Sequence, residues 1–195
     1  MKNEKREFTK SKVTAFLNTC DDCGGVRIYF GSLVSNKNAD TSLVLVMANV
    51  KQEGCDDVYD NGKVLSAWSH SDGTLTDGLQ TTDWATEHVQ NWASIYYGDD
   101  QTTYLPTTSY TMELGTFKKL VAQAENKIVC NMAIHPVDSA CAHGYGWPVG
   151  APQVSQTIDL VIRPDVKPDS GGKSYTYLDF ARPCPRYCGI VSLAD

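Results

Sequence analysis

The amino-acid sequence predicts an α+β protein in which helices pack on one face of a mainly antiparallel sheet. Three observations support this class. Residues 25–31 and 43–50 have the composition of two consecutive strands, and a short segment of helical period precedes them. The same helix-strand-strand order returns in the second half of the chain. Two such units can pool their strands into one sheet and bury the apolar stripes of their helices against it.

Apolar residues recur at helical period in three segments, residues 8–18, 83–97 and 112–125. In the first segment Val13, Phe16 and Leu17 follow the i, i+3, i+4 spacing of a single helix face. Thr9 or Ser11 can cap its N-terminus, because a side-chain oxygen at that position accepts a hydrogen bond from a free backbone N–H group. The sequence therefore predicts three amphipathic helices.

The two opening strands differ in pattern. Residues 25–31 alternate apolar and polar side chains, with Arg27 and Tyr29 on the polar face, so this strand is expected to be half-buried. Residues 43–50 are apolar almost throughout, which predicts a central strand covered on both faces. Further strands are expected at residues 64–68, 128–134, 158–162 and 175–180.

Residues 69–82 are rich in Ser, Thr, Asp and Gly, which is the composition of a connector. We expect residues 1–195 to form a single domain. Within it we predict an internal repeat of residues 8–68 and 112–188, joined by a linker and a helix at 69–111.

The repeat rests on the order of elements and their period. The third helix has the apolar spacing of the first, so Leu17 matches Val121, and an alternating strand follows each helix, so Ile28 matches Cys130. Sequence identity between the two halves is negligible. The alternative is that a common unit recurs by chance in α+β proteins.

Three short segments follow one another in a distinctive order: Cys-Gly-Gly-Val-Arg-Ile-Tyr-Phe-Gly at 23–31, Leu-Val-Leu-Val at 43–46, and Pro-Cys-Pro-x-x-Cys at 183–188. In this order they resemble a group of small uncharacterised bacterial proteins that share these signatures. The resemblance covers about half of the chain. It implies no activity, because none is known for the group.

Charge and hydropathy narrow the classes of partner. The 17 basic and 23 acidic residues give a net charge of -6 with no basic run, so nucleic acid is not an expected partner. No apolar run approaches the ~20 residues of a membrane-spanning helix, so no membrane partner is expected. No apolar signal-peptide core follows the N-terminus, which favours a cytoplasmic location.

Seven cysteines include two close pairs, Cys20-x2-Cys23 and Cys184-x3-Cys188. Four thiolates in such pairs can hold a tetrahedral zinc ion, so zinc is a candidate cofactor. Disulfides and reduced thiols in loops are the two alternatives. An odd number of cysteines leaves at least one outside any intramolecular disulfide, and a reducing compartment is the simpler interpretation.

The predicted connection at residues 135–157 is longer than the ~12–15 residues beyond which loops are usually functional or disordered. Its candidate residues for ligand or partner binding are His135, His143, Tyr145 and Trp147. With Cys141, the two histidines could also hold a catalytic zinc that keeps one position open. No His-Glu-x-x-His motif accompanies them.

The sequence therefore favours a non-enzymatic structural or interaction protein that forms homo-oligomers. Unprotected strands at residues 64–68 or 175–180 could pair with a neighbouring chain, or the aromatic-bearing connection at residues 135–157 could make the contact. Head-to-tail contacts of that kind would propagate into a ring or filament. The alternative is a metal-dependent hydrolase or a small-molecule-binding protein that uses the 135–157 connection.

Overall fold

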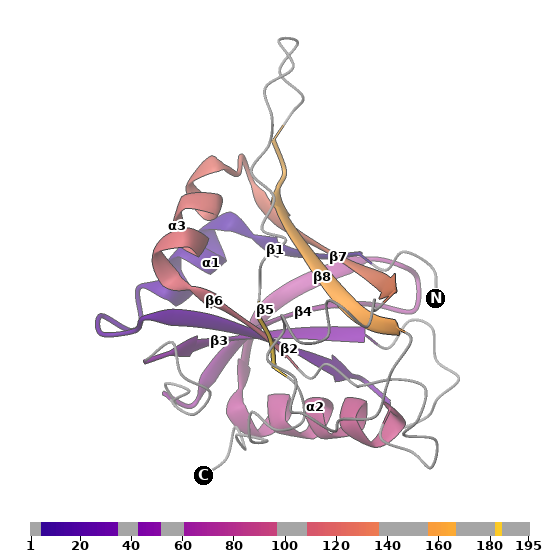
Figure 1. Ribbon diagram of the computed structural model, residues 1–195. Coiled ribbons are helices and arrows are strands. Elements are labelled where there is room, and N and C mark those ends of the chain that lie inside the picture. Colours follow the sequence, from indigo (N-terminus) through magenta and orange to yellow (C-terminus); the bar gives the residue numbers. More distant parts are fainter. Residues whose placement is uncertain are drawn as a thin grey trace, which may run out of the picture.

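A computed structural model describes residues 5–34, 43–51, 61–96, 109–136, 156–166 and 182–184 (Figure 1). Its helices are α1 (Lys10–Leu17), α2 (Thr82–Tyr96) and α3 (Leu114–Gln123). The first five strands are β1 (Lys5–Thr9), β2 (Gly25–Ser32), β3 (Leu43–Val50), β4 (Lys63–Ser69) and β5 (Leu75–Thr81). The others are β6 (Ser109–Glu113), β7 (Lys127–Pro136), β8 (Gln156–Pro164) and β9 (Arg182–Cys184).

All strand pairs are antiparallel, which confirms the α+β class. The strands form two sheets, however, where the sequence predicted one. Six strands pair in the order β5-β4-β3-β2-β6-β9, and three pair in the order β1-β7-β8. Among the described residues, no helix is long and apolar enough to cross a membrane.

The six-stranded sheet is the middle layer of the molecule. Figure 1 shows α2 below this sheet, and α1, α3 and the three-stranded sheet above it. The prediction that the helices share one face is therefore wrong. The reason is the composition of the central strands, which supply apolar side chains to both faces. One core lies between this sheet and the helices α1 and α3, and it includes Phe16, Ile28 and Leu45. A second core lies between the sheet and α2, and it includes Val44, Val46 and Ala85.

The strands β2 and β3 form the central hairpin of the six-stranded sheet, and both are buried at every position. For β3 this confirms the predicted central position. For β2 the predicted half-burial is wrong, because α2 covers the face that carries Arg27 and Tyr29. Arg27 is only 2% exposed and donates a hydrogen bond from Nε to Thr111 Oγ1 at 2.9 Å. Gly31 allows the close approach of α2, because a Cβ there would lie 3.3 Å from the backbone of His88.

The predicted helices exist, with shifted starts. In α1 the residues Val13, Phe16 and Leu17 are buried as their spacing predicted. The helix begins at Lys10 because the preceding residues form β1. In the same way α3 begins at Leu114, directly after β6.

The region predicted to be a connector contains β5, so that prediction is wrong. The strand pairs with β4 through a turn in which Gly73 has a φ of +83°, a value that favours glycine. As a result β4 lies inside the sheet, and residues 64–68 are not an edge. The strand predicted at residues 175–180 lies outside the described residues.

Two segments of the chain have the same order of elements, β1-α1-β2-β3 and β6-α3-β7-β8. Each segment pairs its first strand with the second strand of the other, β1 with β7 and β6 with β2. The registers agree, since Thr9 lies opposite Lys127 and Glu113 lies opposite Gly25. Ile28 and Cys130, matched in the predicted repeat, occupy the same position in these two registers.

The backbone contacts at the two helix starts also agree. The first helical N–H group of α1, on Lys10, donates to the carbonyl of Asn126 at 2.7 Å. The first helical N–H group of α3, on Leu114, donates to the carbonyl of Gly24 at 2.8 Å. In both segments the carbonyl belongs to the residue just before the paired strand of the other segment.

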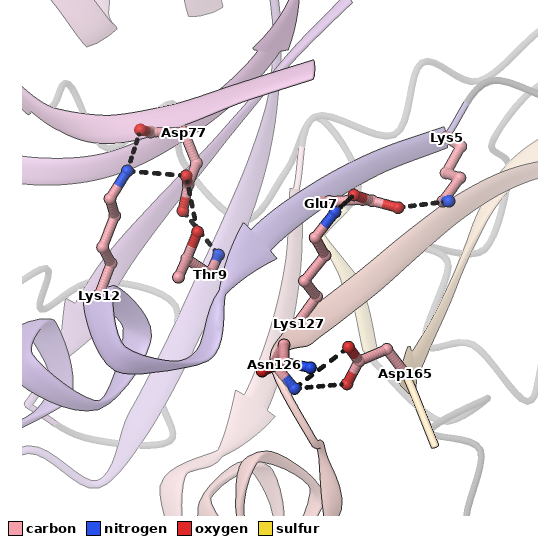
Figure 2. Close-up of polar contacts among 8 residues, drawn as sticks. All are labelled: Lys5, Glu7, Thr9, Lys12, Asp77, Asn126, Lys127 and Asp165. Carbon is pink, nitrogen blue, oxygen red and sulfur yellow. Dashed lines mark hydrogen bonds and ion pairs between the residues drawn. The ribbon is translucent and has the colours of Figure 1, made fainter. Parts of the chain in front are cut away.

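A polar cluster joins β5 to the start of α1 (Figure 2). The Asp77 carboxylate accepts hydrogen bonds from Thr9 N at 2.6 Å, Thr9 Oγ1 at 3.0 Å and Lys12 Nζ at 2.8 Å. Burial tends to raise the pKa of Asp77, but the hydrogen bonds from Lys12 and Thr9 outweigh it and hold the pKa below its usual value. Asp77 therefore links the two sheets as a carboxylate.

Two further sets of polar contacts lie along β1 and at the start of β7 (Figure 2). Glu7 accepts hydrogen bonds from Lys5 and Lys127. Burial tends to raise the pKa of Glu7, but these two lysines lower it below its usual value. Asp165 accepts the backbone N–H of Asn126 with both carboxylate oxygens, at 2.9 and 3.1 Å.

Candidate functional site

The candidate site is the loop at residues 18–24, which joins α1 to β2. Its start is held by Thr19, whose hydroxyl donates to the carbonyl of Phe16 at 2.7 Å. Its end is held by Gly24, whose N–H group donates to the carbonyl of Val50 at 3.0 Å. The loop is therefore fixed both to the end of the helix and to the neighbouring strand.

Within this loop Cys20 and Cys23 form a disulfide, with their Cα atoms 5.6 Å apart. Reduced thiols, one of the alternatives from the sequence, are therefore not the state of this pair. Both cysteines are buried. Asp22 between them is exposed, and its Oδ1 lies 3.3 Å from Cys20 Sγ. The ligand atoms of the three residues lie within 4.8 Å of one another, which makes them a possible metal-binding group.

A buried amide adjoins the loop. Asn49 on β3 is 2% exposed, and its Nδ2 donates to the Phe16 carbonyl at 3.1 Å and to Thr19 Oγ1 at 3.3 Å. Because a carbonyl can only accept, these contacts fix which end of the amide carries the nitrogen. The buried Oδ1 atom has no hydrogen-bond partner in the described part of the chain. Sequence reasoning missed this residue, because Asn49 falls within an otherwise apolar strand.

The second predicted cysteine pair is not brought to this loop by the described residues. Cys184 lies on β9 opposite Ser109, at one end of β6. The other end of β6, Glu113, lies opposite Gly25, beside the loop. Four residues of antiparallel strand span about 13 Å, much more than the ~4 Å that separates two ligands of one zinc ion. Cys188 lies outside the described residues, so the four-cysteine zinc site stays a prediction that the position of Cys184 does not favour.

The predicted binding connection lies almost entirely outside the described residues. β7 continues through His135, whose backbone pairs with Thr157, and β8 begins at Gln156. The intervening residues, 137–155, contain the other candidate residues His143, Tyr145 and Trp147, together with Cys141.

Three further residues that could in principle do chemistry, Cys130, His88 and His70, make contacts that fit a structural role. Burial raises the pKa of the Cys130 thiol to about 12, so this residue is a poor nucleophile and metal ligand. His88 is buried, stacks on Trp84 with the ring centroids 4.0 Å apart, and hydrogen-bonds the Trp84 carbonyl. His70 is exposed and hydrogen-bonds Thr76 at 2.9 Å.

An open hollow lies between α1 and the connection from α3 to β7. Its charged lining residues are Lys10 and Glu125. The Lys10 amine donates to the Ala124 carbonyl at 2.6 Å, so it fastens α1 to the end of α3. No family model, curated protein or solved structure matches this chain, so no ligand can be transferred from a relative.

Proposed function

We propose that the protein is a non-enzymatic structural or interaction protein that associates with further copies of its own chain. The observation that carries this proposal is the outer strand of the six-stranded sheet. β5 pairs with β4 on one side, and its Leu79 is 58% exposed. An exposed apolar side chain on an edge strand is a feature that favours pairing with another chain.

The first half of the outer edge of β5 already makes a hydrogen bond within the chain. The outward carbonyl of Asp77 accepts a hydrogen bond from Lys12 Nζ at 2.6 Å, and a lysine at such a position blunts an edge. Because backbone groups alternate along a strand, the N–H and C=O groups of Leu79 point to the same outward side as that carbonyl. A Cβ added at Gly78 would meet no atom within 4 Å, so the described residues leave the face of the sheet uncovered next to Leu79.

The occupant we propose is the same half-strand of a second copy. Residues 78–81 of two chains would pair antiparallel across a two-fold axis, which brings the two Leu79 side chains close to each other. A two-fold contact of this kind uses the same surface on both chains and closes as a dimer. A contact between β5 and a different surface would instead be head-to-tail.

Light scattering after size-exclusion chromatography, over a hundredfold range of concentration, tests the proposal. We expect the mass of the natural chain to rise to that of a dimer and Leu79→Lys to stay monomeric. Val34→Lys is the matched control, because Val34 is 38% exposed and lies outside β5. A natural chain that stays monomeric throughout, or a Leu79→Lys variant that still dimerises, would contradict the proposal.

We also propose that the segments β1-α1-β2-β3 and β6-α3-β7-β8 descend from one duplicated unit. Their common order, reciprocal pairing and equal register support this origin. In this view the molecule is a fused pair of units that have exchanged their first strands. Exchange of an identical element is a low-cost way to join two copies.

A further inference from the structure

We propose that the loop at residues 20–23 is a metal site controlled by the redox state of its two cysteines. In the disulfide form neither sulfur is a thiolate. After reduction, the thiolates of Cys20 and Cys23 and the carboxylate of Asp22 form a ligand set for a cation of the zinc class. Two sulfurs and one oxygen suit zinc, which accepts thiolate and carboxylate ligands in a tetrahedron. This inference is independent of the proposed self-association.

The distances fit this ligand set. The three ligand atoms lie within 4.8 Å of one another, and Cys20 Sγ is already 3.3 Å from Asp22 Oδ1. Zinc–sulfur bonds of ~2.3 Å place two tetrahedral ligands about 3.8 Å apart. The sulfurs therefore need to separate by only about 2 Å from their bonded distance, a change that side-chain rotation in the loop can supply.

The surroundings divide the site into an inner and an outer half. Cys20 and Cys23 are 4% and 9% exposed, so the sulfurs line the inner half. The Asp22 side chain is 73% exposed, so the outer half is open to an ion from solvent. Lys51 Nζ lies 4.0 Å from the Asp22 carboxylate. This exposed ion pair is weak, and a metal ion can displace the lysine.

Asn49 is the second observation that points to a ligand or a changed redox state here. Its buried Oδ1 atom is an acceptor that has no donor among the described residues. Its Nδ2 atom donates a hydrogen bond to Thr19, the residue before Cys20. A disulfide carries no hydrogen and cannot act as that donor. A thiol or a metal-bound water molecule carries a hydrogen that it can donate, so the reduced or metal-bound loop has a kind of donor that the disulfide form lacks.

The redox step needs a reductant of the dithiol class. Two electrons and two hydrogens pass from the two thiols of the reductant to the disulfide. The Cys20–Cys23 bond breaks, a disulfide forms in the reductant, and two thiols result in the protein. When the cation binds, each thiol releases one proton to solvent, and the two thiolates bind the metal.

The full chain, reduced with excess dithiol and exchanged into oxygen-free buffer without reductant, is titrated with Co²⁺ and then with Zn²⁺. Thiolate-to-cobalt absorption reports binding, and displacement by Zn²⁺ gives the relative affinity. Because other cysteines of the chain can also bind these ions, the readout is the difference in stoichiometry from the double variant Cys20→Ser/Cys23→Ser. We expect that variant to bind one equivalent fewer than the reduced natural chain.

Two neighbouring carboxylates provide a matched pair of variants that does not depend on the buried sulfurs. Asp22 belongs to the ligand set, whereas Asp21 is exposed and outside it. We expect Asp22→Asn to weaken binding at least about tenfold and Asp21→Asn to leave it unchanged. Equal stoichiometry in the natural chain and the double variant, or equal affinity in the two Asp variants, would overturn the proposal.

Discussion

The first segment, β1-α1-β2-β3, and the second, β6-α3-β7-β8, share one topology but are buried to different extents. In the first, β2 and β3 are buried at every position because α2 covers their second face. In the second, the described part of β8 alternates, with Leu160 and Ile162 buried and Val161 and Arg163 less so. The same order of elements therefore serves as a central hairpin in one segment and as an outer hairpin in the other.

The connection between helix and strand differs as well. It spans residues 18–24 in the first segment and residues 124–126 in the second. In the first the N–H group of Gly24 donates to the Val50 carbonyl, whereas in the second the N–H group of Asn126 donates to the Asp165 carboxylate. The longer connection accommodates the disulfide loop. A metal site in this loop would therefore belong to one segment only.

The largest expected loss of stability comes from a core substitution in α3, and the matching substitution in α1 provides the comparison. Phe117 on α3 and Val13 on α1 occupy matching positions, and both are fully buried. We expect Phe117→Ala to lower the free energy of unfolding by about 3–5 kcal/mol, because a phenyl ring leaves a large cavity. Val13→Ala should cost about half as much, because it removes less apolar surface. Urea denaturation of both variants measures this; a greater loss from Val13→Ala would show that α1 is the main core helix.

Replacing the disulfide should have the next largest effect. In the chain-entropy account a closed loop of four residues contributes about 2 kcal/mol of stability. We expect the double variant Cys20→Ser/Cys23→Ser to lose this amount, measured by denaturation without reductant. Adding a dithiol should lower the stability of the natural chain by a similar amount in the absence of metal. If neither change affects stability, the disulfide does not support the first segment.

Asp77 and Glu113 lie at the two helix starts but make different contacts. Asp77 on β5 accepts hydrogen bonds from Thr9 on β1 and Lys12 on α1, whereas exposed Glu113, at the end of β6, accepts one from Thr116 on the helix that follows. We expect Asp77→Asn to cost about 1–2 kcal/mol at pH 7, as for loss of charge-assisted hydrogen bonds. Glu113→Gln should change stability by less than about 0.5 kcal/mol. Equal losses would mean that the contact between the sheets is unimportant.

The lowered pKa of Asp77 predicts that the stability of the protein depends on pH. The pKa of Asp77 lies below its usual value in the folded protein, so its contribution is complete above about pH 4 to 5, near and above the unfolded pKa. It is lost as the pH falls through the folded pKa. The stability difference between the natural chain and Asp77→Asn should therefore be constant from pH 7 to 5 and shrink in more acidic buffer. A stability difference that grows on acidification would contradict this prediction, because it would mean that the folded protein raises the pKa of Asp77.

The smallest expected effect concerns Asp165. Asp165→Ala removes the carboxylate that accepts the Asn126 N–H group, and we expect a loss of about 1 kcal/mol. Asp21→Ala, at an exposed site in the loop of the other segment, is the control and should change stability little. Thermal unfolding resolves the two. A neutral Asp165→Ala variant would mean that water replaces the carboxylate without cost.

The sequence predicted the elements with strong apolar patterns and missed those without. α1 and β3 were found because their buried residues follow clear periods. β5 was missed because its residues, Leu-Thr-Asp-Gly-Leu-Gln-Thr, have the composition of a connector, and only pairing with β4 makes them a strand. β1 and β6 were missed because each is a five-residue strand whose pairing partner lies about a hundred residues away.

The candidate site was predicted only in part. The close spacing of Cys20 and Cys23 identified the loop, but their oxidation state depends on geometry that spacing alone does not give. Asp22 was not among the metal ligands predicted from the sequence, and Asn49 carries no signal in an apolar strand. The burial of Arg27 likewise depends on α2, which is remote in sequence.

The two segments pair reciprocally, the first strand of each with the second strand of the other, in matching register. Through-space proton contacts in nuclear magnetic resonance spectra test this pairing most directly. We predict cross-strand contacts between Phe8 and Ile128 and, equally, between Met112 and Val26. Contacts of Phe8 with Val26 and of Met112 with Ile128, in which each segment keeps its own first strand, would contradict the account.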